Sequence, residues 1–257
     1  MRELDRHSHP PFAHAFTSPL RVAIIGNGRA GNALARALRH AGDEVDGPLR
    51  RGVRPRDADA VLLCVPDAEI AGAAALLPLG PAVGHCSGAT GLEVLGAHRS
   101  FSMHPLMTIP ADARADVFVG AGAAVAGSTA ETLDLARALA ARMGMRPIEI
   151  APGDRAAYHA AASIASNFLI TLEAAAERLA ATAGVEREDL VPLVRATVEN
   201  WARFGAERAL TGPVARGDDA TVAAQREAVL ERIPELAPLF DALVGATRAV
   251  AGAGASV

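Results

Sequence analysis

The spacing of hydrophobic and polar positions changes in the middle of the chain. Up to about residue 151, short apolar runs typical of strands alternate with segments of helical periodicity. From about residue 152 the strand pattern stops, and long stretches with helical spacing of apolar residues follow. Alternating strands and helices predict a mostly parallel sheet covered on both faces. We therefore expect an α/β fold, a Rossmann-type mostly parallel sheet followed by an all-helical C-terminal domain.

The predicted domains follow from this change. Residues 20–151 form the Rossmann-type domain, and residues 152–257 form the helical domain. Residues 1–19 contain His7, His9, His14 and several prolines without periodicity, which predicts a flexible leader. The strands are expected at 21–25, 43–49, 58–65, 82–86, 99–105, 122–127 and 146–151, and the helices at 30–42, 66–77, 129–144, 155–184, 187–210, 219–233 and 234–252.

Composition excludes several classes of partner. The net charge of −4 gives no reason to expect a nucleic acid or an anionic membrane surface. No uninterrupted apolar run reaches the roughly 18 residues of a membrane span, and the first residues are too polar for a signal peptide. Cys64 and Cys86 are too few for a disulfide framework or a zinc site, so we expect no metal. These observations predict a cytoplasmic protein.

All 25 basic residues are arginine, and the chain contains no lysine. This bias is better explained by the base composition of the genome than by selection on the fold. It nevertheless excludes a Schiff base, a lysine general acid and a lysine phosphate clamp.

A glycine-rich turn follows the first predicted strand. Gly26, Gly28 and Gly31 satisfy the spacing G-x-G-x-x-G between a strand and a helix, which is the pattern of a dinucleotide-binding turn. The glycines allow a tight turn and a close approach of the backbone to a pyrophosphate at a helix N-terminus. A purely structural turn is the alternative. The predicted contacts with the cofactor here are Gly26, Asn27, Gly28, Arg29, Ala30 and Gly31.

The end of the second predicted strand indicates which dinucleotide binds. An acidic residue there suits the ribose of NAD, whereas an arginine suits the 2′-phosphate of NADP. Arg50 and Arg51 follow this strand, and Arg29 of the glycine turn reaches the same side. Asp46 is the competing signal, but it lies within the strand, and the two arginines are also compatible with a solvated turn. We expect NADP (NADPH) as the cofactor.

Other strands predict further contacts at their carboxyl ends, where open parallel sheets bind ligands. The third strand ends in Cys64, Val65 and Pro66, and the fourth is followed by Ser87 and Gly88. His85, at the end of the fourth strand, is equally compatible with a buried core histidine. His104 precedes a proline at the end of the fifth strand, which favours a place beside the nicotinamide.

Polar residues interrupt the apolar helix predicted over 155–184. His159, Ser163 and Asn167 are spaced by four, and steps of four advance only about 40° around an α-helix. They therefore form one slanting stripe. Hydrogen bonding to neighbouring helices is the simplest explanation, and a substrate site is the alternative.

Segments in this order resemble a known superfamily: HCSGATG (85–91), SMHPLM (102–107), YHAAASIASNFL (158–169) and LTGPVARGD (210–218). The resemblance covers residues 20 to about 250. It is to an uncharacterised Rossmann-like branch of the β-hydroxyacid dehydrogenase-like enzymes, which carry a 6-phosphogluconate-dehydrogenase-like helical domain. Relatives in that superfamily are ketopantoate reductase, pyrroline-5-carboxylate reductase, prephenate dehydrogenase and the deazaflavin-dependent NADP oxidoreductases.

Local likenesses assign roles to particular residues. GDEVDGPLR (42–50) resembles the second strand of ketopantoate reductases, which implies that Arg50 holds the 2′-phosphate. MHPLM resembles the His-Pro segment of prephenate dehydrogenases and implicates His104. The helix with Asn167 resembles the K-x-x-x-N helix of ketopantoate and hydroxyisobutyrate-type enzymes, but Ser163 occupies the position of the catalytic lysine.

That departure leads to a hypothesis about catalysis. His159 lies one turn before Ser163, and a histidine exchanges protons near neutral pH. His159 then supplies the proton, Ser163 relays it and Asn167 orients the substrate, while His104 lines the same site. Arg216, in the loop within the helical domain, suits a substrate carboxylate, although a helix cap or ion pair is the simpler explanation.

The sequence thus predicts an NADP-dependent oxidoreductase that transfers a hydride to or from a small oxo acid or imine. Two alternatives remain, an oxidative decarboxylation of the prephenate dehydrogenase type and a non-catalytic NADP-binding sensor or scaffold. The alanine-rich apolar faces of the helical domain predict a homodimer.

Overall fold

The structure is a computed structural model that describes residues 18–254. His7, His9 and His14 of the predicted leader lie outside the described residues. The chain divides into two compact units, Met1–Ile164 and Ala165–Val257. In the part of the chain that is described, no helix is both long enough and apolar enough to cross a bilayer.

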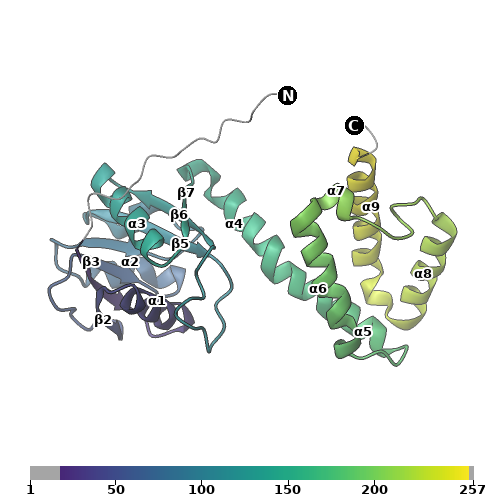
Figure 1. The fold of residues 1–257 in the computed structure, drawn as a ribbon, viewed down its shortest axis with the longest axis horizontal. Coiled ribbons are helices and arrows are strands. Elements are labelled where there is room, and N and C mark those ends of the chain that lie inside the picture. The colour runs from purple at the N-terminus through teal and green to yellow at the C-terminus, as the bar shows by residue number, and fades with distance from the viewer. Residues whose placement is uncertain (1–17, 255–257) are drawn as a thin grey trace. The chain divides into compact units, whose positions relative to one another are not determined.

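The first unit is built on a seven-stranded sheet in the order β2-β1-β3-β4-β5-β6-β7 (Figure 1). Strands β1 to β5 are parallel, β6 runs antiparallel to β5, and β7 is parallel to β6. Because the chain leaves β1 toward β2 on one side and then returns to β3 on the other, the carboxyl ends of β1 and β3 form a topological switch point. The strands are β1 (Arg21–Ile25), β2 (Glu44–Leu49), β3 (Ala60–Leu63), β4 (Ala82–His85), β5 (Ser100–Leu106), β6 (Gly122–Gly127) and β7 (Arg146–Glu149).

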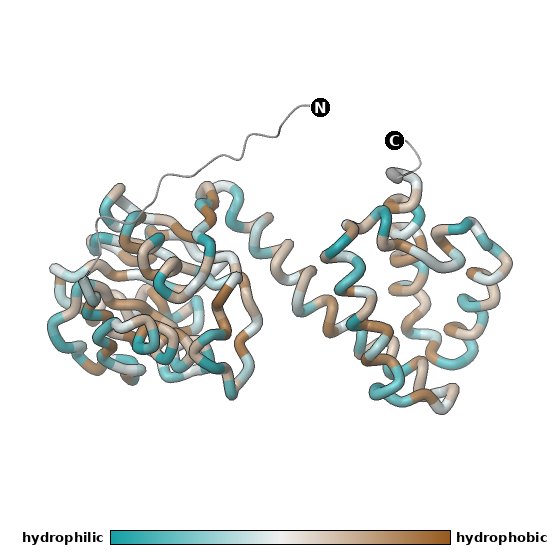
Figure 2. The backbone as a smooth tube through the Cα atoms, in the orientation of Figure 1, coloured by the Kyte–Doolittle hydropathy of each residue, from teal (hydrophilic) through white to brown (hydrophobic). Residues whose placement is uncertain are grey.

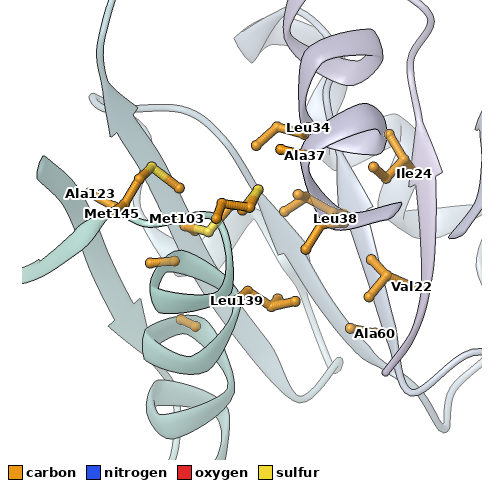
Figure 3. Packing of buried hydrophobic residues seen from close by; sticks show 14 of the residues in the cluster. Val22, Ile24, Leu34, Ala37, Leu38, Ala60, Met103, Ala123, Leu139 and Met145 are labelled. Atoms are coloured by element: carbon orange, nitrogen blue, oxygen red, sulfur yellow. The ribbon is translucent and has the colours of Figure 1, made fainter. Parts of the chain in front are cut away.

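Alternate residues of the central strands enter two separate cores. Val22 and Leu62 pack with apolar residues of α1 (Arg29–His40) and α3 (Ala130–Arg142) on one face of the sheet, as Figure 3 shows for Val22, Leu38 and Leu139. Ala23 and Val61 pack with α2 (Ile70–Ala75) on the opposite face. Strands buried on both faces explain the continuous apolar runs in the sequence, and each fully buried leucine contributes about 2 kcal/mol through burial. The predicted fold class is confirmed.

The helix predicted over 66–77 is shorter than expected. A 3₁₀ turn, η1 (Asp67–Glu69), comes first, and α2 begins only at Ile70 and ends at Ala75. Pro78 prevents the helix from reaching the predicted end, because a proline disfavours helical geometry in Leu77, the residue before it. Another short 3₁₀ turn, η2 (Leu92–Leu95), lies between β4 and β5.

The helix predicted over 155–184 is present from Arg155 to Ala181, but a π turn interrupts it. After the 3₁₀ turn η3 (Pro152–Asp154), α4 covers Arg155–Ser163, a π-helical turn, η4, covers Ile164–Phe168, and α5 covers Leu169–Ala181. A π turn holds more residues than an α turn, and so the four-residue spacing no longer keeps Asn167 on the stripe that begins at His159. The apolar periodicity could not reveal this, because it continues through the π turn.

The second unit is helical throughout its described elements. Besides α5 it contains α6 (Arg187–Phe204), α7 (Ala206–Ala209), α8 (Asp219–Arg232), the 3₁₀ turn η5 (Pro234–Leu236) and α9 (Ala237–Gly254). The helix expected over 187–210 is divided at Gly205, whose φ of 76° ends α6. Hydropathy alternates along these helices within the unit (Figure 2).

Candidate functional site

The turn between β1 and α1 has two glycines at positions where a side chain would collide with the backbone. A Cβ on Gly26 would lie 2.1 Å from the carbonyl oxygen of Cys64, and its φ of 115° is itself unfavourable for other residues. A Cβ on Gly31 would lie 1.9 Å from the carbonyl oxygen of Gly26. These two glycines therefore let the turn pack against the end of β3.

Gly28 is different, because a Cβ there would meet no atom within 4 Å. It is the N-cap of α1 with an ordinary φ of −72°, and neither the fold nor the backbone geometry requires a glycine. No side chain caps α1, and its first turn has no acidic residue. The turn thus presents open space beside unsatisfied N–H groups at the positive end of a helix dipole, which is the environment that binds a phosphate. Asn32 steadies the turn by donating to the carbonyl oxygens of Asn27 and Gly28.

Arg50 lies directly beside this turn. A bulge in the pairing of β1 with β2 places Leu49 opposite Ile25, and the N–H of Gly26 donates to the carbonyl oxygen of Leu49 at 2.8 Å. Arg50 is the next residue; its side chain is exposed, and its guanidinium has no partner within the described residues.

The other charged residues near the second strand are placed differently. Arg51 forms an ion pair with Glu69, so its charge is already compensated. Asp46 lies within β2 and accepts a hydrogen bond from the backbone N–H of Arg56 at 2.9 Å. Arg29 is exposed at the start of α1. Arg50 and Arg29 are thus the arginines here that are open to a phosphate.

Cys64, Val65 and Pro66 lie at the end of β3, as predicted. The backbone of Cys64 contacts the glycine turn, and its Sγ lies 3.7 Å from the Sγ of Cys86, with both thiols free. Pro66 is exposed, and Val65 is half-buried. Among the described residues, no group of three or more His, Cys, Asp or Glu side chains is arranged to hold a metal ion.

Ser87 and Gly88 follow β4. The hydroxyl of Ser87 donates to Asp67 at 2.6 Å and accepts from the backbone N–H groups of Ala89 and Thr90, so it shapes the loop. Gly88 lies against two imidazole rings, because a Cβ there would come within 2.9 Å of both His104 and His159. The loop after β4 therefore brings these two histidines to one place.

A cluster of polar side chains lies on the face of the sheet opposite α1. Ser102 and His104 share one face of β5 because strand residues alternate, and side chains from the start of α4 reach both of them. Arg155 donates to the hydroxyl of Ser102 at 2.6 Å and to the carbonyl oxygen of Thr90 at 3.0 Å. The hydroxyl of Tyr158 lies 2.7 Å from Nδ1 of His104.

His85 serves the fold. Its side chain is fully buried, Nδ1 accepts from the backbone N–H of Ser87, and Nε2 faces the carbonyl oxygen of Gly91 at 3.1 Å. These two partners require the neutral tautomer with its proton on Nε2. Burial lowers the pKa of His85, which agrees with that assignment.

The electrostatics of the cluster keep His104 neutral. Its pKa is lowered to about 4, mainly by burial and also by the neighbouring His159 and Arg155, whereas Asp67 opposes the shift. Burial also raises the pKa of Tyr158, against the influence of Arg155. Near neutral pH, the pair of His104 and Tyr158 is therefore uncharged.

The remaining predicted residues are spread over both units. His159 is exposed on α4, with its ring centroid 6.1 Å from that of His104. Ser163 is the last residue of α4 in the first unit, while Asn167 lies in η4 and belongs to the second unit. Arg216 is exposed in the loop between α7 and α8 of the second unit. The roles of Ser163, Asn167 and Arg216 stay predictions.

Sequence reasoning missed Tyr158 and Arg155. Both lie on the same helix as His159, and the spacing of 155, 158 and 159 places them on one face. Tyr158 is also the only tyrosine of the chain. The helical spacing of these three polar side chains was therefore an available signal, although their partners in β5 and in the loop after β4 were not.

Fold and site together define a Rossmann-like protein with a helical C-terminal region. Residues 122–247, just under half of the chain, match a family described as a domain of unknown function (DUF2520). This region runs from the first residue of β6 into α9. No similar sequence was found among curated proteins.

Solved structures share this fold over almost the whole chain. A protein from Bacteroides fragilis, described as a candidate NADP oxidoreductase, has 19% identity and a TM-score of 0.76, covering 90% of this chain and 98% of its own. A protein from Thermotoga maritima has 24% identity and a TM-score of 0.73 over the same shares. A reductive aminase from Aspergillus terreus, solved with NADPH and ethyl levulinate, has 17% identity and a TM-score of 0.63, covering 92% of this chain and 95% of its own. At these identities the comparison establishes the fold.

Proposed function

We propose that the protein is an NADP-dependent oxidoreductase that transfers a hydride between the nicotinamide and a small oxo acid or imine. The observation that carries the proposal is the turn at Gly28, where open space meets the uncapped N-terminus of α1. The descriptions of structures with the same fold support it, since they include a candidate NADP oxidoreductase and a reductive aminase solved with NADPH.

The residues present fit a dinucleotide with a 2′-phosphate. The turn at Gly28 and the start of α1 would hold the pyrophosphate, and Arg50, beside the same turn, would hold the 2′-phosphate. Asn27, Arg29 and Ala30 complete the turn, with Cys64, Val65 and Pro66 at the neighbouring strand end. When bound, the reduced nicotinamide supplies the hydride.

The substrate is placed by the polar cluster at the end of β5. His104 and Gly88 lie on elements that end at the carboxyl edge of the sheet, where ligands of open α/β folds bind. Besides the hydride, the reaction needs a proton, which the sequence assigns to His159.

Consumption of NADPH tests this function. Purified protein is supplied with NADPH and a panel of small 2-oxo acids, ketones and cyclic imines, and the loss of NADPH absorbance is followed. We expect turnover with at least one class and none without acceptor. Binding of NADPH without oxidation by any acceptor would instead support a non-catalytic sensor.

We further propose that the second unit forms a homodimer through α5 and α6. Neither helix contains a buried residue, although Ile170, Leu193 and Trp201 are large apolar side chains and are more than half exposed. Apolar surface of this kind marks an interface. The mass of the protein in solution tests the proposal, with Leu193→Glu expected to give the monomer. The same change at Leu230, an exposed leucine of α8, is the control and should leave the dimer intact.

A further inference from the structure

Tyr158 and His104 form a hydrogen-bonded pair that the proposed reaction has not yet used. The hydroxyl of Tyr158 lies 2.7 Å from Nδ1 of His104, and the two rings meet edge to face with centroids 5.6 Å apart. Both side chains are half-buried, whereas His159 is exposed. The geometry therefore favours Tyr158 over His159 as the ordered source of a proton.

At neutral pH the proton that this pair can donate is on the hydroxyl of Tyr158. His104 is neutral because burial lowers its pKa to about 4, so it is not an acid itself. Tyr158 holds its proton because burial raises its pKa. A neutral imidazole can accept a hydrogen bond from the hydroxyl at Nδ1 in one tautomer, and in the other tautomer it donates from Nδ1 to the phenolate once that has formed.

We propose that Tyr158 is the proton donor in the reduction of a carbonyl substrate, an oxo acid or ketone, and that His104 is the positioning residue that holds its hydroxyl and returns its proton; this inference rests on the proposed function. The carbonyl carbon gains the hydride from the reduced nicotinamide, and its π electrons move to oxygen. That oxygen takes the proton from Oη of Tyr158, which gives the alcohol. The phenolate regains a proton from Nδ1 of His104, while Nε2 takes one from water.

The chemistry of Tyr158 selects a carbonyl over an imine. Hydride addition to a carbonyl produces an alkoxide, which is a much stronger base than a phenolate and takes its proton readily. An imine must instead be protonated before the hydride arrives, and a phenol whose pKa lies above about 10 is a poor acid for that step. An iminium substrate would arrive already charged and would need no donor.

Arg155 supports the phenolate that forms during the reaction. Arg155 is only 7% exposed, and its guanidinium donates to two uncharged acceptors, the carbonyl oxygen of Thr90 and the hydroxyl of Ser102. Within the described residues, no carboxylate lies within ion-pair distance of it. Its positive charge therefore remains available to favour ionised Tyr158, and it lowers the pKa of that group.

Titration of Tyr158 tests the pair without any substrate. Because the chain has one tyrosine, the absorbance of phenolate on raising the pH reports this group alone. We expect ionisation above the value of the unfolded chain, and a further rise of about one pH unit in His104→Phe, which removes the donor to the phenolate. His159→Ala is the control, with little shift, and circular dichroism at each pH verifies the fold. Other charged groups around the pair are the same in all variants: Asp67 on η1, His85 on β4, Glu93 on η2 and Arg155 on α4.

Turnover completes the test. Tyr158→Phe keeps the ring and should lower the reduction of an oxo acid by about a hundredfold to ten-thousandfold, while the affinity for NADPH stays the same. His159→Ala should lower this activity less than Tyr158→Phe does, because an exposed imidazole is replaced and the ordered hydroxyl of Tyr158 remains. Reduction of a preformed iminium should be nearly equal in wild type and Tyr158→Phe.

Each outcome decides the matter. If Tyr158 ionises at the same pH in wild type and in His104→Phe, the two residues do not act as a pair. Normal turnover of Tyr158→Phe, or its loss only in His159→Ala, overturns the donor while the proposed function stands. The titration of Tyr158 can respond to His104→Phe while no acceptor oxidises NADPH. That result would refute the proposed function, and with it the role of Tyr158 as a donor.

Discussion

Replacing Gly28 with alanine is expected to weaken NADPH binding by at least about a hundredfold while leaving the melting temperature almost unchanged. A Cβ at this position meets no protein atom within 4 Å, and the φ of −72° suits alanine. The cost to the fold is therefore the small loss of a glycine N-cap. The added methyl group instead occupies the space through which the backbone N–H groups approach a pyrophosphate, and a hundredfold loss corresponds to about 2.7 kcal/mol.

Gly26→Ala provides the comparison. There the Cβ would lie 2.1 Å from the carbonyl oxygen of Cys64 at a φ of 115°, so the backbone itself must move. We expect a loss of stability of about 3 kcal/mol or more, which lowers the melting temperature by roughly 10 °C. Thermal unfolding and NADPH titration of both variants separate a glycine needed for the fold from one needed for the ligand. Unchanged NADPH affinity in Gly28→Ala would contradict the proposed place of the pyrophosphate.

Arg50→Ala is expected to weaken NADPH binding about tenfold to a hundredfold and to leave NADH binding unchanged. Arg50 follows Leu49, whose carbonyl oxygen accepts from the N–H of Gly26, and its guanidinium has no partner within the described residues. A charge-assisted hydrogen bond to the 2′-phosphate accounts for the expected loss, since NADH lacks that group. The difference between the two cofactors should shrink as the salt concentration rises.

Arg36→Ala is the matched control for Arg50. Arg36 is an exposed arginine on the body of α1, and its removal changes the net charge equally. Its affinity for NADPH should equal that of wild type. Equal losses of NADPH and NADH binding in Arg50→Ala would show that this arginine does not recognise the 2′-phosphate.

The parts of the fold that sequence predicts well are those set by nearby residues. The strands β1 and β3 are apolar on both faces, and the glycine turn is a local motif, so both could be found without a structure. Arg50 was also accessible, because the end of β2 lies at a fixed distance along the chain from the glycines. The bulge that pairs Leu49 with Ile25 was not, since it depends on the partner strand.

The polar cluster depends on contacts that sequence patterns do not contain. Tyr158 and His104 are 54 residues apart, and only the fold brings the start of α4 within reach of β5. The π turn had no signal either, because the residues of Ile164–Phe168 are equally compatible with an ordinary α-helical turn. For this reason the stripe of His159, Ser163 and Asn167 seemed continuous, although Asn167 belongs to the second unit.

The most direct test of the account is the titration of wild-type protein with NADPH and with NADH, followed by the fluorescence of the nicotinamide. We expect saturable binding of both cofactors, with NADPH the tighter because of Arg50. Saturation by neither cofactor would contradict it, because the open turn at Gly28 would then not be a dinucleotide site.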